Sequence, residues 1–327
     1  MSAFSEIIGH TGIIKSLKSS ILSNRISHAY IFDGQAGMGK TMLAKALAKT
    51  VQCEARGADA CGRCISCRTF ESNNHPDIFY VTSTKKSIGV DDIREQVIKP
   101  METPAYRYRY KVFIIGNADT MTAAAQNALL KTIEDPAPYG LFILLSENYN
   151  AFLPTVVSRC VVFRLKPLPE PDVINYLSDK EIGGEQARFY SAFSQGNIGR
   201  AMRLASSQAF TEMRETVVSL AQALRRLDMP DLFASYRMLE PYKDDIQDLL
   251  DLFMIWYRDV IIIKETNSTR FIFQPDKQNE IFAEAQATEL SSLYKKFDAI
   301  WQAKRSLKQN GNFQLTLEMM LISLGSG

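Results

Sequence analysis

Residues Gly34 to Thr41, which read Gly-Gln-Ala-Gly-Met-Gly-Lys-Thr, constrain the fold more than any other segment. The spacing of the glycines and the Lys-Thr pair after them are typical of a phosphate-binding loop. Glycines let backbone N–H groups approach phosphates closely, and a following helix directs its positive end at them. We therefore expect ATP with Mg²⁺ as the ligand. The candidate nucleotide-binding residues of the loop are Gly34, Gly37, Gly39, Lys40 and Thr41. A glycine-rich turn that matches by chance is the alternative.

The segments around this loop predict alternating strands and helices. Residues 28–32 form an apolar run before the loop, and residues 41–52 show apolar residues at helical spacing after it. Further strand-like runs lie at 78–81, 112–115, 142–145 and 160–163, with helical segments at 91–99 and 122–134 between them. This order predicts an α/β fold whose parallel sheet is covered by helices on both faces. Ligands of such sheets bind at the carboxyl ends of the strands.

Chain length and local composition predict three domains. A chain of 327 residues is too long for one compact core. The segment 166–171, Lys-Pro-Leu-Pro-Glu-Pro, marks a boundary, and the chain beyond it is expected to be helical throughout. We expect a nucleotide-binding domain at 1–165, a small helical domain at 166–207 and an all-helical domain at 208–327.

Composition limits the classes of partner. A net charge of +2 does not indicate a general nucleic-acid binder, so any DNA contact requires a local patch. Residues 104–111 alternate aromatic and basic side chains, as single-strand platforms do, but a solvated loop leading into a strand is the preferred interpretation. No signal peptide or membrane-spanning run is evident, so we expect a cytoplasmic protein without a membrane partner.

Four of the five cysteines lie close together in the sequence, within residues 53–67. Four thiolates at short spacing can close a tetrahedron around Zn²⁺ without an open position, which indicates a structural site. The candidate ligands are Cys53, Cys61, Cys64 and Cys67. His75 is a possible competing ligand, a redox switch is the other interpretation of the cysteines, and Cys160 is expected to pack in the interior.

The strand at 112–115 is followed by residues that bear on catalysis. Nucleotide hydrolysis requires a carboxylate that holds the metal and another that orients water. This strand end and the segment 127–136, Asn-Ala-Leu-Leu-Lys-Thr-Ile-Glu-Asp-Pro, resemble the clamp-loader branch of the AAA+ ATPases. The resemblance implies that the two carboxylates belong at positions 116 and 117, where this chain has Gly116 and Asn117. Neither side chain can replace a carboxylate, and Asp119 is an unlikely substitute.

The resemblance extends over nearly the whole chain and implies roles for further residues. Ser158-Arg159-Cys160 resembles the family triplet whose arginine acts in trans, as an arginine finger in the nucleotide site of a neighbouring subunit. Arg200, in Gly-Asn-Ile-Gly-Arg-Ala, resembles the second sensor that touches the γ-phosphate. The cysteine insertion is similar to that of bacterial clamp-loader subunits, with an AAA+ domain, a helical lid and a collar that assembles the ring.

The resemblance implies a clamp-loader subunit of the bacterial DNA polymerase III holoenzyme, without ATPase activity of its own. Its implied partners are the ATPase subunits and the delta subunit, and indirectly the sliding clamp and primed DNA. The finger Arg159 would then serve the neighbouring ATPase. Two alternatives stay open: an active clamp-loader ATPase, and a zinc-dependent DNA-binding protein in which the nucleotide is structural.

Overall fold

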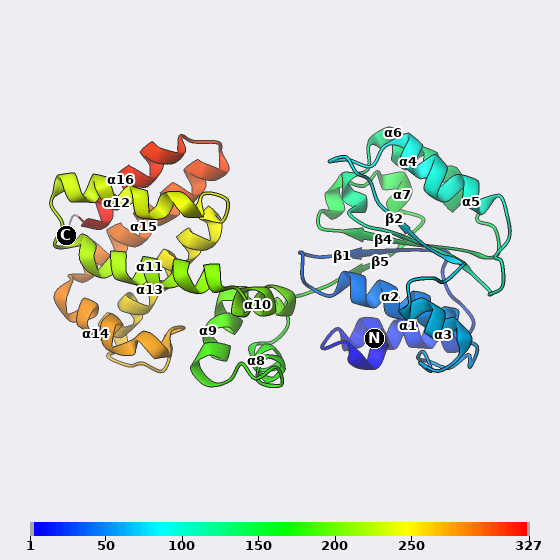
Figure 1. Cartoon of the computed structure of the whole chain (residues 1–327), viewed down its shortest axis with the longest axis horizontal. Helices are drawn as coiled ribbons and strands as arrows, with labels where there is room; N and C mark the ends of the chain where they lie inside the picture. The colour runs from blue at the N-terminus through cyan, green and yellow to red at the C-terminus, as the bar shows by residue number, and fades with distance from the viewer. Residues whose placement is uncertain (1–2, 326–327) are drawn as a thin grey trace. The chain divides into compact units, whose positions relative to one another are not determined.

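The computed structural model describes residues 3–325, which fall into two compact units. The first unit is Met1–Leu168 and contains the sheet; the second is Pro169–Gly327 and is helical (Figure 1). Over the described residues, none of the helices is both long enough and apolar enough to cross a membrane. The division of the second unit into a lid and a collar stays a prediction.

A five-stranded sheet with all neighbours parallel forms the centre of the first unit. Its order is β2-β3-β4-β1-β5, so β1, which precedes the phosphate-binding loop, lies between β4 and β5. The α/β prediction is confirmed, and each predicted strand is present within two residues of its expected bounds. The strands are β1 (Ala29–Asp33), β2 (Ile78–Val81), β3 (Lys111–Ile115), β4 (Gly140–Ser146) and β5 (Val161–Arg164).

The register of the sheet places the functional segments at one edge. Asp33, the last residue of β1, pairs with Ser146 of β4 and with Arg164 of β5. The central strands β3 and β4 are buried along their whole length, as expected for a sheet covered on both faces. The phosphate-binding loop follows the carboxyl end of β1. It therefore lies at the same edge of the sheet as the carboxyl ends of β3 and β4.

Helices cover both faces of this sheet, and each face has its own apolar core (Figure 1). Helices α1 and α2 pack on one face and α4, α6 and α7 on the other. The predicted helix at 91–99 is a continuous helical segment with a π-helical middle, α4–η2–α5. The helical elements are η1 (Phe4–Glu6), α1 (Thr11–Leu22), α2 (Lys40–Val51), α3 (Ile65–Glu71), α4 (Val90–Ile93), η2 (Arg94–Ile98), α5 (Lys99–Met101), η3 (Ala118–Thr120), α6 (Ala123–Glu134), η4 (Tyr149–Ala151) and α7 (Pro154–Val157).

The second unit consists of helices that surround a core with the fully buried Trp256 and Tyr257. Several begin at a side-chain cap; Asn197 accepts a hydrogen bond from Arg200 N at the start of α10. The elements are α8 (Glu170–Ser178), α9 (Gly184–Ser194), α10 (Ile198–Ala205), α11 (Gln208–Leu224), α12 (Met229–Leu239), η5 (Glu240–Tyr242), α13 (Ile246–Thr266), η6 (Pro275–Lys277), α14 (Gln278–Ala287), α15 (Leu290–Lys308) and α16 (Phe313–Gly325).

Candidate functional site

The phosphate-binding loop connects β1 to α2, as the sequence predicts. Gly34 N donates to Ser146 O at 3.1 Å, which ties the start of the loop to the end of β4. Gly34 has φ +154°, and a Cβ there would lie 3.1 Å from Leu165 Cβ. Gly39, with φ +89°, is in a left-handed conformation that favours glycine. The backbone thus requires glycine at both ends of the loop, and its shape fits a phosphate cradle.

The Lys40 side chain is turned toward the loop itself. Its Nζ donates to Gly34 O at 2.5 Å and to Gln35 O at 3.0 Å, and it lies 3.6 Å from Glu147 Oε1. Lys40 is 9% exposed, whereas Thr41 next to it is exposed on the first turn of α2. A phosphate group that bound here would compete with two carbonyls and one carboxylate for the ammonium.

The His10 side chain binds the middle of the loop, at the carbonyl of Met38. Its Nε2 lies 3.0 Å from Met38 O, so the ring nitrogen donates to that carbonyl in the neutral tautomer. Burial lowers the pKa of His10 below its usual value, although the Met38 hydrogen bond opposes this shift. The loop is therefore fixed by a neutral histidine.

The end of β3 carries no carboxylate at the two positions that follow the strand. Gly116 N donates to Val81 O, and Asn117 is exposed in a left-handed conformation with φ 47° and ψ 44°. A Cβ built on Gly116 would meet only Val81 O, at 3.9 Å, an ordinary contact distance. Asp119 lies beyond this turn, on η3. A side chain thus fits at position 116, and its absence is not imposed by packing.

Arg159 lies on the surface, just after α7 and before β5. Its Nη2 forms an ion pair with Glu134 Oε1 at 2.9 Å, and its Nη1 donates to Thr155 O at 2.9 Å. The side chain is still 37% exposed. Nη1 also donates to Ser158 Oγ at 3.2 Å, so three partners orient the guanidinium, which remains accessible to a ligand outside this chain.

Arg200, in the second unit, contacts acidic residues of the same unit. Its Nη2 lies 2.6 Å from Asp248 Oδ1 and 3.7 Å from Asp251 Oδ2, both on α13. The guanidinium also lies over the Phe193 ring, 4.9 Å from its centroid. These contacts join α9, α10 and α13, so the guanidinium already has strong partners.

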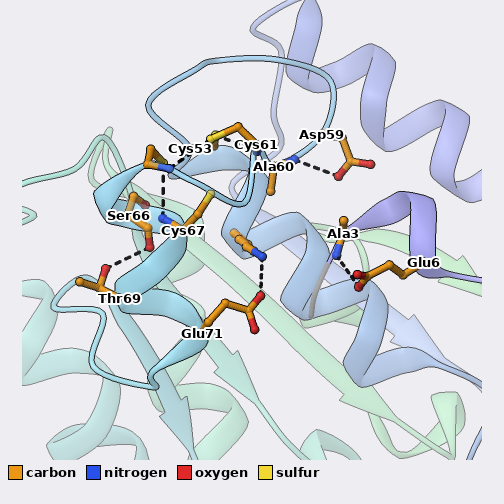
Figure 2. Close-up of polar contacts among 12 residues, drawn as sticks. Ala3, Glu6, Cys53, Asp59, Ala60, Cys61, Ser66, Cys67, Thr69 and Glu71 are labelled. Carbon is orange, nitrogen blue, oxygen red and sulfur yellow. Dashed lines mark hydrogen bonds and ion pairs between the residues drawn. The ribbon is translucent and has the colours of Figure 1, made fainter.

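The four clustered cysteines come together as the sequence predicts. One sulfur from each of Cys53, Cys61, Cys64 and Cys67 lies within 4.8 Å of the others. Figure 2 shows Cys53 and Cys61 close to Cys67, which belongs to α3. A Zn–S bond of about 2.3 Å places tetrahedral sulfurs about 3.8 Å apart, so this donor set fits Zn²⁺.

Backbone N–H groups donate to the sulfurs of this cluster, which favours thiolates. Cys61 N donates to Cys53 Sγ at 3.3 Å, and Cys64 N donates to Cys61 Sγ at 3.4 Å. Hydrogen bonds from backbone N–H groups, those of Arg63 and Cys64, lower the pKa of Cys61 to about 6. Burial raises the pKa of Cys53 and of Cys67. A metal ion would therefore displace protons from the buried thiols of Cys53 and Cys67 when it binds.

The loop between these cysteines is docked on the N-terminal segment. Asp59 accepts hydrogen bonds from Phe4 N and Ser5 N, both at 3.0 Å. Lys49 forms an ion pair with Glu71, which joins α2 to α3. Residues 53–71, which comprise the four cysteines and α3, are called the cysteine module below. This module is therefore attached both to the N-terminal segment and to α2.

His75, the possible competing ligand, has other partners. Its Nε2 lies 3.1 Å from Ser66 Oγ, and its Nδ1 accepts from Asp77 N at 3.2 Å. The group of metal-binding side chains in the described part of the chain comprises the four cysteines without His75. Cys160 is partly buried against the apolar core beside α6 and α7, and burial raises its pKa to about 12.

Several acidic partners of these residues carry no recognisable signal in the sequence. Glu147 faces Lys40, Glu134 faces Arg159, and Asp248 faces Arg200. None belongs to a motif with fixed spacing to its partner, because each pair is formed by packing of separate elements. Only Glu134 stands within a segment that the sequence singled out, at the end of α6.

Family comparisons match most of the chain. The family described as "DNA polymerase III, delta subunit" matches residues 9–169, and "DNA polymerase III, delta subunit, C terminal" matches residues 208–325. The DNA polymerase III subunit delta' of Bacillus subtilis is 31% identical over 318 residues, which is 96% of each chain. The tau subunit of the same organism is 24% identical over 98% of this chain, which spans 61% of that longer protein.

Two solved structures align over most of this chain at low similarity. A gamma-subunit-related protein of DNA polymerase III from Thermotoga maritima is 16% identical, with TM-score 0.43, over 95% of this chain and 98% of that one. The Bacillus subtilis DNA clamp loader delta protein is 13% identical, with TM-score 0.34, over 96% of this chain and the whole of that one.

Proposed function

The chain belongs to the delta-prime subunit family of DNA polymerase III, and from this premise we propose that it supplies an arginine finger to a neighbouring ATPase without hydrolysing ATP itself. Its partners would be the ATPase subunits and the delta subunit of a clamp loader. Through them it would act on the sliding clamp and on primed DNA. Similarity to tau and gamma subunits supports an assembly of related chains.

The observation that carries this proposal is the end of β3. Gly116 and Asn117 stand where hydrolysis needs one carboxylate for the metal and one for the attacking water. Because the backbone at Gly116 has room for a side chain, the missing acid is a property of the sequence rather than of crowding. A chain of this kind is expected to bind nucleotide without turning it over.

The position of Arg159 supports the other half of the proposal. A guanidinium stays charged at all physiological pH values, and its planar fork suits the oxygens of a transferring phosphoryl group. Arg159 is partly exposed and is held by Glu134 and by Thr155 O, so it is oriented before any partner arrives. Preorganisation of this kind lowers the cost of placing the charge in the transition state.

The remaining sites have supporting roles in this proposal. Lys40 and Thr41 would hold the phosphates and Mg²⁺ of a bound ATP, and the four cysteines would hold a structural Zn²⁺. For Arg200, contact with a γ-phosphate requires its guanidinium to leave Asp248. We therefore infer that Arg200 mainly stabilises the packing of α9, α10 and α13 within the helical unit.

The decisive experiment is a clamp loader reconstituted with Arg159→Ala in this subunit alone. We expect slower ATP hydrolysis in the presence of clamp and primed DNA, and slower clamp loading. The loss should be smaller than the roughly 10³-fold or larger effects of fingers in single-site GTPases, because other sites in the assembly stay intact. Arg94→Ala, which removes a side chain that is 64% exposed on the same unit, is the matched control.

The isolated chain tests the absence of turnover separately. We expect no ATP hydrolysis by the wild-type chain at enzyme concentrations that give measurable hydrolysis in the assembly. Turnover by the isolated chain at the rate of the assembly would favour an active ATPase. Unchanged hydrolysis and loading with Arg159→Ala would remove the finger from the proposal.

A further inference from the structure

The aromatic and basic segment Tyr106–Tyr110 is fixed by a buried carboxylate. Asp77, which is fully buried, accepts hydrogen bonds from three consecutive backbone N–H groups. The donors are Tyr106 N at 2.5 Å, Arg107 N at 3.0 Å and Tyr108 N at 3.0 Å. Hydrogen bonds to a carboxylate are among the stronger ones in proteins, so the backbone of this segment has a defined shape.

Gln52 holds the other end of the segment through hydrogen bonds to its backbone. Gln52, which is 3% exposed, accepts from Tyr110 N at 3.1 Å through Oε1 and donates to Tyr110 O through Nε2. Asp77 and Gln52 both bind the backbone of the segment, and the side chains of Arg107 and Arg109 stay exposed. The segment is therefore the solvated loop that the sequence favoured, with a backbone held in a defined shape that presents two arginines to solvent.

These arginines line a cavity of about 320 Å³ beside the cysteine module. Arg56, from the loop that follows Cys53, adds a third guanidinium to its wall, and Glu54 is the one acidic lining residue. Arg107 lies over the Tyr108 ring at 5.7 Å and Arg109 over the Tyr110 ring at 5.1 Å. Within residues 3–325, none of the three guanidinium groups forms an ion pair with a carboxylate.

A buried hydroxyl in the same cavity lacks a partner. Thr50 lines the cavity and is 1% exposed, and its Oγ1 forms no hydrogen bond with any described residue. An unpaired buried hydroxyl costs free energy unless a ligand or a water supplies its hydrogen bond. Its Oγ1 atom is shielded from solvent in the structure, so it would donate to an anion in the cavity only after a small movement of the Thr50 side chain.

We propose that this cavity binds a phosphate of single-stranded DNA. Arginines suit phosphate oxygens because the guanidinium fork donates two parallel hydrogen bonds. The three guanidinium groups supply donors, to which the Thr50 hydroxyl would add one after a small side-chain movement, and the rings of Tyr108 and Tyr110 supply flat apolar surface for a neighbouring sugar or base. Tyr106, at the start of the same segment, is 84% exposed. The net charge of +2 indicates that this local patch, rather than the whole chain, supplies the attraction.

The test is the binding of a fluorescein-labelled oligothymidylate to the full chain, measured by fluorescence anisotropy at several salt concentrations. We expect the double variant Arg107→Gln/Arg109→Gln to weaken binding about tenfold or more. Its salt dependence should also fall, by about 0.7 in the slope of log K against log salt for each lost phosphate contact. Thr50→Val, which keeps the shape and removes the hydroxyl, should weaken binding several-fold without this change in slope.

Controls separate the site from general charge effects and from other phosphate ligands. Arg94→Gln removes one exposed positive charge from the same unit and should leave affinity within about twofold. An excess of inorganic phosphate or dTMP should compete weakly with the oligonucleotide. Equal binding by wild type and the double variant would overturn the site, and dTMP binding as tightly as the oligonucleotide would overturn its assignment to a DNA strand.

Discussion

The Arg159 guanidinium forms its 2.9 Å ion pair with Glu134, the last residue of α6, while it also donates to the carbonyl of Thr155. The two side chains are 37% and 45% exposed, so the pair contributes at most about 1 kcal/mol to folding. Its main consequence is the orientation of the guanidinium. The proposed finger therefore depends on a residue that itself touches no nucleotide.

Substitution of Glu134 is expected to impair the finger partly. Glu134→Ala in the reconstituted assembly should slow ATP hydrolysis less than Arg159→Ala, because the Thr155 carbonyl still holds the guanidinium. The double variant should hydrolyse ATP no more slowly than Arg159→Ala alone, since Glu134 acts through Arg159. Steady-state ATPase rates of the four assemblies check this. Additive losses would show that Glu134 acts on something else.

One tightly bound zinc per chain is expected from the four cysteines. Metal analysis of protein purified without added zinc should find close to one equivalent, and Cys64→Ser should lose it and unfold at a lower temperature. Cys160→Ser, which lies outside the cluster, should keep the metal. A metal-free protein with freely titratable thiols would contradict the zinc site.

Nucleotide affinity should respond in opposite directions to two substitutions in the phosphate-binding loop region. Lys40→Ala should weaken ATP binding by about tenfold or more, because it removes the charge that would neutralise the phosphates of a bound ATP. Glu147→Gln should strengthen binding several-fold, because Glu147 competes for the same ammonium at 3.6 Å. Isothermal titration measures both, and weaker binding by Glu147→Gln would contradict this competition.

Stability should fall in mild acid, in part through His10. Burial lowers the pKa of His10, as it does for His28 and His75. The unfolded chain therefore takes up protons below about pH 6.5 that the folded chain does not, so the free energy of unfolding decreases as pH falls through that range. His10→Gln keeps a donor for Met38 O and removes one titrating group. Urea denaturation at pH 7, 6 and 5 should show a smaller pH dependence for this variant, and an equal or larger one would contradict the assignment.

Arg200 and Asp248 should show an energetic coupling within the helical unit. The pair is less than one-quarter exposed, with side chains 23% and 22% exposed, so its coupling should be about 1 kcal/mol. A double-mutant cycle of Arg200→Ala and Asp248→Ala, followed by the fluorescence of Trp256 and Trp301 in the same unit, measures this value. A coupling energy of zero would contradict the structural role of Arg200. The nucleotide-sensor role that the sequence predicts would then be the remaining interpretation.

Local sequence was sufficient to predict the elements whose chemistry depends on neighbours along the chain. The loop Gly34–Thr41 and the strand before it needed only glycine spacing and an apolar run, and β2 begins and ends where its apolar run does. The cysteines between 53 and 67 are close in sequence, so their meeting in space required only a short turn and the start of α3. The sequence also showed the acids missing at Gly116 and Asn117, because their positions are fixed by the end of β3.

Only the tertiary structure decided which charged groups face one another. Lys40 meets Glu147, Arg159 meets Glu134 and Arg200 meets Asp248 through the packing of separate elements, and no residue spacing encodes these pairs. The segment Tyr106–Tyr110 has the composition of an exposed loop, yet Asp77 and Gln52, distant in sequence, give its backbone a fixed shape. Motifs therefore determined the chemistry available to this protein. The fold determined which partners each charged group has, because long-range packing sets distances that local sequence leaves free.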